Sequence, residues 1–195
     1  PVERHGNRGG LGDMAFTTFL NWNRGQFHTN LGLNVYAPTG YYDEDSIINL
    51  GRNYWSFDPL LTFTWLHPER GHEVSIVTGV MFNTENHATD YQTGSEFHAD
   101  FMLAQHFSPQ FALGLTGYYY NQLSDDSGPL VDQLDALGRA NGGLQGDAVG
   151  VGPAVLFTPK LFGRDVNLIA KWLNDFGTSN PLRYSRVSRW SACLS

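Results

Sequence analysis

The sequence predicts an all-β chain: an antiparallel up-and-down transmembrane β-barrel of about 8–12 strands, with its long loops on one rim. Three observations lead to this fold class. Long segments alternate strictly between apolar and polar residues, the connections between them are short and long by turns, and aromatic residues gather near the segment ends. The pattern leaves open whether the chain closes such a barrel by itself or is incomplete at both ends.

The clearest alternation runs over residues 96–107 and resumes over 111–122, after a Ser-Pro-Gln break. Alternation with a period of two is typical of strands, and a break that contains proline indicates a hairpin turn. Each run is about twice as long as a usual strand and close to the length with which a tilted strand crosses a bilayer. In the first run, the expected lipid face carries Phe97, Ala99, Phe101 and Leu103, and the expected lumen face carries Glu96, His98, Asp100 and His106.

The same alternation predicts strands on both sides of this hairpin. We expect them, in chain order, over residues 13–23, 27–37, 55–65, 73–83, 148–157 and 165–172. Pro59 lies inside the third of these. Because proline has no backbone N–H to give to a neighbouring strand, it predicts a bulge or a late start there. From residue 174 onward we expect a loop and then a basic tail.

The connections between the expected strands alternate in length. Short breaks over 24–26, 67–71, 108–110 and 158–163 alternate with long segments over 38–54, 83–95 and 123–146 and from 174 onward. Outer-membrane barrels combine short periplasmic turns with longer extracellular loops in this way. A soluble up-and-down barrel has no reason to keep its long loops on one rim.

The longest internal connection also carries a helix signal. Leu130, Leu134 and Leu137 are spaced as on one face of a helix, so we expect a short helix there, which Asp126 and Ser127 would cap. We therefore expect a single domain over residues 1–195. Its parts are an N-terminal loop over 1–11, a long loop with this helix over 123–147, and an atypical basic tail over 177–195.

Composition narrows the classes of function. The net charge of −7 argues against a nucleic-acid partner, because phosphate binding requires a basic surface. The single cysteine, Cys193, excludes an internal disulfide and a cysteine zinc site. No run approaches the roughly 18 apolar residues of a transmembrane helix. The mean hydropathy of −0.30 fits strands with one apolar and one polar face.

Aromatic residues make up 14% of the chain, and many of them lie close to the ends of the expected strands. Belts of aromatic residues are typical of the two membrane interfaces of an outer-membrane barrel. We expect these belts to include Trp22, Phe27, Trp55, Trp65, Phe82, Phe97, Phe107, Phe111, Phe157 and Trp172. A soluble β-domain with a phenylalanine-rich core is the alternative interpretation.

Several motifs, most of them in the expected loops, together resemble a known family. In chain order they are Gly10-Leu11-Gly12-Asp13, Ala37-Pro38-Thr39-Gly40-Tyr41-Tyr42-Asp43, Asn49-Leu50-Gly51-Arg52-Asn53-Tyr54-Trp55-Ser56, Phe82-Asn83-Thr84-Glu85-Asn86, Ala88-Thr89-Asp90-Tyr91-Gln92-Thr93-Gly94, Gly117-Tyr118-Tyr119-Tyr120-Asn121-Gln122-Leu123, Asp126-Ser127-Gly128 and Val151-Gly152-Pro153. With these motifs the chain resembles, from about Gly10 to Phe176, the outer-membrane family named for the MetA pathway of phenol degradation, the SphA-like transporters.

The resemblance implies a β-barrel in the outer membrane of a Gram-negative bacterium that moves hydrophobic and aromatic compounds inward. The loop residues that carry the resemblance are Pro38, Thr39, Gly40, Asn49, Gly51, Asn53, Asn83, Asn86, Thr89, Asp90, Tyr91 and Gly94. Their asparagines and glycines more often fix loop turns than touch a solute.

The chain departs from this family at both ends. Family members are usually longer at the amino end, so we expect one or more strands to be missing before Pro1. They also end on an aromatic strand that serves in membrane insertion. Here the last residues instead contain Arg183, Arg186 and Arg189, which would be costly on a strand that crosses lipid.

No catalytic constellation is visible in the sequence. There is no nucleophile elbow, phosphate loop, HExxH or paired-cysteine motif, so we expect no enzyme activity and no cofactor. His98, Asp100 and His106 share the expected lumen face with His28 and Glu73, which raises the question of a metal site. The two histidines of the 96–107 strand are eight residues apart, roughly 26 Å along a strand. They cannot share one ion, so we favour a polar lining and no metal.

Eight residues form the expected path for a solute through the lumen. Strand parity turns all of them inward: Tyr36, Met81, His98, Asp100, Met102, Tyr118, Tyr120 and Gln122. Their aromatic and thioether groups would either give an apolar solute a path or simply fill a narrow barrel. The acidic loop residues Asp43, Glu44, Asp45, Asp125 and Asp126 are best explained as solvated charge, with calcium or lipopolysaccharide-bridging cations as the alternative.

These observations favour a channel or transporter that passes small hydrophobic compounds, aromatic ones among them, without chemistry. Its expected partners are outer-membrane lipid, lipopolysaccharide, the solute and, as a homo-oligomer, further copies of itself. The alternative is a structural protein whose β-sheet assembles with other copies through an exposed edge. An enzyme embedded in a barrel is a distant third hypothesis.

Overall fold

The computed structural model describes residues 9–46, 48–138, 144–161, 163–178 and 189–194. Its elements are β1 (Met14–Arg24), β2 (Phe27–Ala37), β3 (Ser56–His67), β4 (His72–Asn83), β5 (Glu96–Ser108), β6 (Phe111–Gln122), α1 (Pro129–Ala136), β7 (Asp147–Phe157), β8 (Lys160–Leu161), β9 (Arg164–Asp165), β10 (Leu168–Thr178) and β11 (Arg189–Leu194). Within these ranges, nine strands form one sheet in the order β1-β2-β3-β4-β5-β6-β7-β10-β11, and β8 and β9 form a separate small hairpin. Every neighbouring pair is antiparallel, so the predicted all-β, up-and-down arrangement is confirmed.

The hairpin predicted over residues 96–122 is confirmed. Strands β5 and β6 pair from Glu96 opposite Gln122 down to Ser108 opposite Phe111, with one irregularity in register between His106 and Ser108. Its turn consists of Pro109 and Gln110. The period-two pattern of these residues therefore fixed both strands and the turn between them.

Pro59 causes neither the bulge nor the late start that its position predicted. Strand β3 begins at Ser56, and its register with β4 is the same on both sides of the proline, from Ser56 opposite Asn83 to Leu60 opposite Gly79. On the β2 side Pro59 is paired with Leu33, whereas no pair joins it to β4. The pairing with β4 is therefore interrupted at Pro59, whereas the pairing with β2 continues through it.

The last strands differ from the prediction. We expected a strand over 165–172 and a loop from 174, but β10 covers Leu168–Thr178. The connection after β7 is longer than a tight turn, because it contains β8 and β9, which pair with each other as a small antiparallel hairpin. Strand β10 then continues along β7, with Asn174 opposite Val151 and Asp175 opposite Gly150.

Parts of the predicted terminal segments lie outside the described residues. Of the N-terminal loop expected over 1–11, residues 1–8 are outside, and of the basic tail expected over 177–195, residues 179–188 and 195 are outside, with Arg183 and Arg186 among them. Within the tail, residues 189–194 form β11, which pairs with β10. The expectation of a tail without a strand is therefore wrong at these residues.

The helix α1 forms where it was predicted, but not with the predicted cap. Its N-cap is Gly128, with φ of 127°, and no side chain caps its N-terminus. The carboxylate of Asp126 instead accepts a hydrogen bond from the backbone N–H of Gly94 (2.9 Å) and one from the hydroxyl of Tyr91. The side chain of Asp126 therefore joins two loops and does not cap the helix.

The two faces of the sheet differ in the way that the alternation predicted. On β3, Ser56 and Asp58 are 0% and 2% exposed, whereas the intervening Phe57 is 39% exposed and Leu61 is 49% exposed. The same holds along the sheet, where the exposed apolar side chains include Phe27, Leu31, Phe63, Val74, Ile76, Leu103, Leu113, Leu115, Val149 and Val155. A soluble sheet buries its apolar face. In this sheet the apolar face is exposed.

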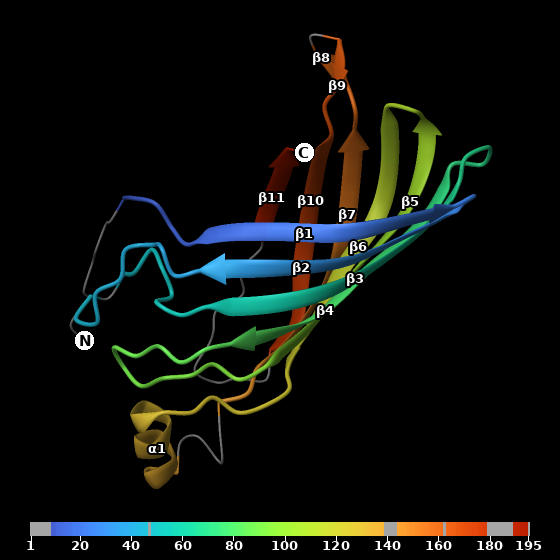
Figure 1. Cartoon of the computed structure of the whole chain (residues 1–195). Coiled ribbons are helices and arrows are strands. Elements are labelled where there is room, and N and C mark those ends of the chain that lie inside the picture. The colour runs from blue at the N-terminus through green and yellow to red at the C-terminus, as the bar shows by residue number, and fades with distance from the viewer. Residues whose placement is uncertain (1–8, 47, 139–143, 162, 179–188, 195) are drawn as a thin grey trace.

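The long connections gather at one rim of the sheet and the short turns at the other (Figure 1). At the loop rim, Asn86 bridges to Tyr91 and Gln92 bridges to Ser127, so the segment after β4 is joined to the one after β6. The strands near β1 run across the direction of those near β10 in Figure 1, so the sheet is strongly twisted and curved. The long loops on one rim are thus confirmed.

The sheet is open in the described part of the chain. Strand β1 pairs only with β2 and strand β11 only with β10, so no ladder joins the two ends of the nine-stranded order. Every residue of β1 is exposed, as expected for an edge. Among the described residues there is no helix with the length and apolar character needed to cross a membrane.

Candidate functional site

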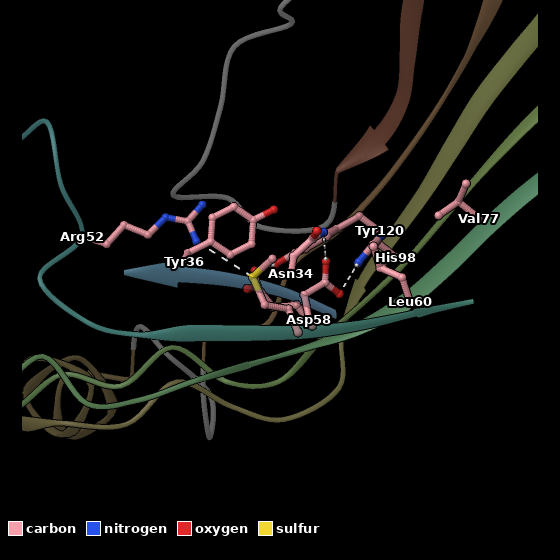
Figure 2. A pocket seen from close by; sticks show the side chains of 10 residues that line it. Asn34, Tyr36, Arg52, Asp58, Leu60, Val77, His98 and Tyr120 are labelled. Atoms are coloured by element: carbon pink, nitrogen blue, oxygen red, sulfur yellow. Dashed lines mark hydrogen bonds and ion pairs between the residues drawn. The ribbon is translucent and has the colours of Figure 1, made fainter. Parts of the chain in front are cut away.

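A cavity of about 400 Å³ lies on the polar face of the sheet. That volume is in the range of small-molecule sites. Figure 2 shows its side chains, which come from β2, β3, β4, β5, β6 and the loop after β2. They are Asn34, Tyr36, Arg52, Asp58, Leu60, Val77, Met81, Glu96, His98 and Tyr120.

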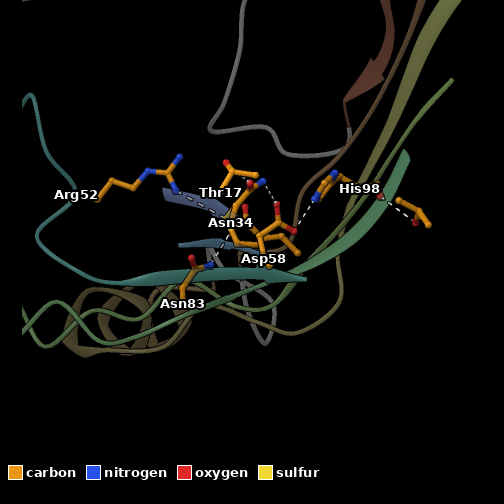
Figure 3. A network of polar contacts seen from close by, with 9 residues as sticks. Thr17, Asn34, Arg52, Asp58, Asn83 and His98 are labelled. Atoms are coloured by element: carbon orange, nitrogen blue, oxygen red, sulfur yellow. Dashed lines mark hydrogen bonds and ion pairs between the residues drawn. The ribbon is translucent and has the colours of Figure 1, made fainter. Parts of the chain in front are cut away.

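The floor of the cavity is a chain of hydrogen bonds centred on Asp58 (Figure 3). The hydroxyl of Thr17 donates to Asn34 Oδ1 (2.8 Å), and the amide of Asn34 donates to Asp58 Oδ2 (3.2 Å). On the other side, Nε2 of His98 lies 2.9 Å from Asp58 Oδ1. Asp58 is 2% exposed, so a buried carboxylate is held here by one neutral donor and one imidazole.

Gly79 makes the contact between Asp58 and His98 geometrically possible. The two residues belong to β3 and β5, which are separated by β4. A Cβ on Gly79 would lie 2.7 Å from Asp58 Oδ1 and 2.7 Å from His98 Nε2. The hydrogen bond between Asp58 and His98 therefore passes over Gly79, where other residues would have a side chain. A side chain at this position would displace at least one of the two partners.

The loop side of the cavity is built around Glu96. Its carboxylate accepts a hydrogen bond from the hydroxyl of Tyr120 and another from the amide of Asn83 (3.0 Å). Asn83 in turn accepts a bond from the hydroxyl of Ser56 (2.7 Å). Both carboxylate oxygens of Glu96 are thus engaged by neighbours from β4 and β6.

Arg52 covers the cavity from the loop after β2. Its guanidinium carbon lies 6.0 Å from the ring centroid of Tyr36, and its Nη1 lies 3.9 Å from the sulfur of Met81. The backbone N–H of Arg52 donates to Asp13 Oδ2 (2.8 Å), and that of Gly40 donates to Asp13 Oδ1 (2.9 Å). One carboxylate just before β1 therefore fastens both ends of this loop.

The structure brings together four of the eight residues predicted to form the solute path. Tyr36, Met81, His98 and Tyr120 line the cavity. The remaining four do not line it, and they are Asp100, Met102, Tyr118 and Gln122. The hydroxyl of Tyr118 donates to Asp175 (2.7 Å), and the amide of Gln122 donates to Asp126. A role in solute passage remains a prediction for all eight.

Glu96 was expected on the lumen face but was not part of the predicted solute path. Five further lining residues were not predicted for that path either: Asn34, Arg52, Asp58, Leu60 and Val77. A usable signal existed for Asn34 and Asp58, which are polar residues at lumen-facing positions of their strands. The sequence around Asn34 and Asp58 does not indicate that they form a hydrogen bond, because that contact depends on the register between β2 and β3. Arg52 belongs to a loop, whose path alternation does not predict.

The histidines of the polar face lie in separate networks, as their spacing predicted. His98 contacts Asp58, whereas Nε2 of His106 lies 2.6 Å from Glu73 Oε2. His28 lies 2.6 Å from Asn23 through its Nδ1. In the part of the chain that the structure describes, no group of three or more His, Cys, Asp or Glu residues could hold a metal ion.

The loop motifs bind their own backbone and each other. The amide of Asn49 donates to the carbonyl of Asp43 (3.0 Å), and the N–H of Asp43 returns a bond to Asn49 Oδ1 (3.0 Å). Asn53 donates to the side chain of Asn86 (2.8 Å). Asn53 and Asp90 also have positive φ angles, of 63° and 51°, which asparagine and aspartate adopt more readily than most residues.

An exposed apolar face, a polar face and long loops on one rim are features that outer-membrane β-barrels combine. Among solved structures, the fold is similar to the crystal structure of the COG4313 outer membrane channel from Pseudomonas putida F1, with a TM-score of 0.73 and 17% sequence identity. The match covers 94% of this chain and 64% of that chain. This chain therefore corresponds to about two thirds of that channel.

The chain belongs to the family described as "Putative MetA-pathway of phenol degradation", whose model matches residues 2–190. The resemblance that the loop motifs indicated is thereby confirmed, and the match extends beyond the motifs at both ends. A comparison with curated proteins gave no match.

Proposed function

We propose that this chain forms the wall of an outer-membrane β-barrel through which small hydrophobic compounds, aromatic ones among them, pass without chemical change. The carrying observation is the distribution of side chains over the two faces. Leu61 and Leu103, 49% and 45% exposed, lie on the face that would meet lipid and lipopolysaccharide, while buried Asp58 lies on the opposite face. Only a nonpolar surrounding makes such a distribution favourable over a whole sheet.

The cavity supports passage of a small molecule. Its lining combines apolar groups from Tyr36, Leu60, Val77 and Met81 with the polar floor around Asp58. Sites for small ligands combine apolar walls with a few placed polar groups in this way. The family description, with its reference to phenol degradation, supports aromatic compounds as the solute class.

Transport is tested by uptake of a neutral aromatic compound, radiolabelled benzyl alcohol, into liposomes that carry the purified full chain. We expect uptake to exceed that of empty liposomes, and we expect the protein to cause only a small ion conductance, because apolar side chains form part of the cavity lining. Liposomes with well-inserted protein that take up no more than empty ones would contradict the transport function.

A second candidate function is favoured by the open edges of the sheet. The exposed strand β1 has an unpaired edge in the described residues, and such an edge can pair with another chain. A structural protein that assembles from several copies would use this edge. Gel migration of the detergent-extracted protein before and after boiling separates the two candidates, because a closed barrel is expected to shift on boiling.

A further inference from the structure

The cavity contains two carboxylates, and each of their oxygens already has a hydrogen-bond partner within the protein. Asp58 accepts bonds from Asn34 and from His98. Glu96 accepts bonds from Tyr120 and from Asn83. Donors within the protein therefore already hold both carboxylates in place.

Arg52 is in the opposite situation. Its guanidinium offers five N–H donors in a planar fork. The contacts of this group are the ring of Tyr36 at 6.0 Å and the sulfur of Met81 at 3.9 Å. Among the described residues, no carboxylate lies within 4 Å of it as an ion-pair partner. The cavity thus has one cation with unused hydrogen-bonding capacity.

The loop that carries this cation is anchored through its backbone. The N–H of Arg52 donates to Asp13, and Gly51 packs so closely on Gly40 that a Cβ on Gly51 would lie 2.8 Å from the carbonyl carbon of Gly40. In Figure 2 the side chain reaches from the loop over Tyr36 toward the cavity. A guanidinium above an aromatic ring is further held by cation–π attraction.

The groups below Arg52 suit a planar apolar body. The sulfur of Met81 lies 3.9 Å from Nη1 of Arg52 and the ring centroid of Tyr36 lies 6.0 Å from its guanidinium carbon, while Leu60 and Val77 also line the cavity. A ring placed there would keep one substituent at Arg52. The two carboxylates make a second negative charge on the ligand unfavourable at this site.

From this arrangement we infer that Arg52 selects small aromatic monocarboxylates within the proposed solute class. The inference rests on the proposed transport function. The ligand carboxylate accepts two parallel bonds from the guanidinium fork, a geometry that lysine cannot reproduce. The ring lies on Tyr36 and Met81, and aromatic dicarboxylates are excluded by Asp58 and Glu96.

The inference is tested by calorimetric binding of benzoate, its neutral isostere benzamide, and phthalate to the full chain in detergent. We expect benzoate to bind about tenfold more tightly than benzamide, the low end for hydrogen bonds to a charged group, because Arg52 is exposed to solvent. Phthalate should bind more weakly than benzoate. Equal binding of benzoate and benzamide by the natural chain overturns the inference.

Two variants separate the role of Arg52 from a general change of the protein. Arg52→Gln should reduce benzoate binding to the level of benzamide and leave benzamide unchanged. Arg52→Lys keeps the charge but loses the fork, so benzoate affinity should fall between the two. Both variants keep the backbone bond to Asp13, so the loop is expected to stay in place. A benzoate affinity that Arg52→Gln does not change also overturns the inference.

The liposome experiment keeps this inference distinct from the transport function. If benzyl alcohol enters but benzoate has no advantage in binding, the monocarboxylate inference fails and the channel function stands. If benzyl alcohol does not enter while benzoate binds as expected, the transport function fails and selection by Arg52 stands as a property of a binding site.

Discussion

At the scale of single residues, two glycines let polar side chains bond across an intervening strand. Gly79 lies between Asp58 and His98, and Gly150 lies where Tyr118 reaches Asp175. A Cβ on Gly150 would lie 2.4 Å from Cε1 of Tyr118. In both places the missing side chain is what allows a bond between strands that are not neighbours in the sheet.

We predict that Gly79→Ala breaks the bond between Asp58 and His98. The added methyl group cannot fit beside both partners, and overpacking of this kind costs about 1–3 kcal/mol. The measurements are the free energy of unfolding in detergent and the NMR resonances of the His98 ring. Gly146→Ala is the matched control, because a Cβ there meets nothing within 4 Å. Equal stability of the two variants with unchanged His98 resonances would contradict this role for Gly79.

At the scale of elements, strands β2 to β6 carry mainly apolar side chains on one face and more polar side chains on the other. On β5, Leu103 is 45% exposed on the apolar face, and a Cβ on Gly117 would lie 2.6 Å from a ring carbon of Phe101. Aromatic residues near the strand ends follow the same division, since Trp22, Trp55, Phe107 and Phe157 are all exposed. The strands thus have the side-chain distribution of membrane-crossing strands.

We predict that Phe101→Arg impairs membrane assembly, whereas Asp100→Arg does not. The two positions are adjacent on β5 but face opposite sides of the sheet. An arginine on the lipid face near the membrane centre costs about 2–4 kcal/mol. The measurement is the membrane-integrated fraction after expression, determined by protease resistance. Normal assembly of the Phe101 variant, or failure of both, would show that the two faces are assigned incorrectly.

At the scale of the whole molecule, the backbone groups at the two edges of the open sheet need hydrogen-bond partners. Strands β1 and β11 are each paired on one side only in the described residues, and unpaired backbone groups are costly in lipid. A closed barrel is the arrangement that satisfies them within the channel hypothesis. An assembly of several copies through β1 is the arrangement that satisfies them within the structural hypothesis.

We predict that the detergent-extracted protein migrates faster on a denaturing gel before boiling than after it. A closed barrel keeps its compact structure in the detergent until it is heated, because no edge is available for unfolding to begin. A boiled sample of the same chain is the internal control. Absence of a shift, together with chemical cross-linking of unboiled protein into a series of multimers, would favour assembly through the edges.

Much of the fold followed from local pattern. The strands over 27–37 and 111–122 have the predicted bounds, because alternation and turn residues act over a few neighbouring positions. The end of β10 and the strand β11 were missed, since Asn174 and the arginine-rich end show no such alternation. Their pairing depends on the strand beside them, which supplies the hydrogen bonds.

The sequence by itself determined the strands, their order along the chain, the division into an apolar and a polar face, and the family, because each depends on residues close together or on motifs in order. Only the tertiary structure decided the cavity. Asp58 and His98 are separated by 40 positions and meet only through the registers of three strands across Gly79. Arg52 reaches the same place because Asp13, 39 positions earlier, binds its backbone. Contacts over such separations depend on sheet register and loop path, which no local pattern specifies.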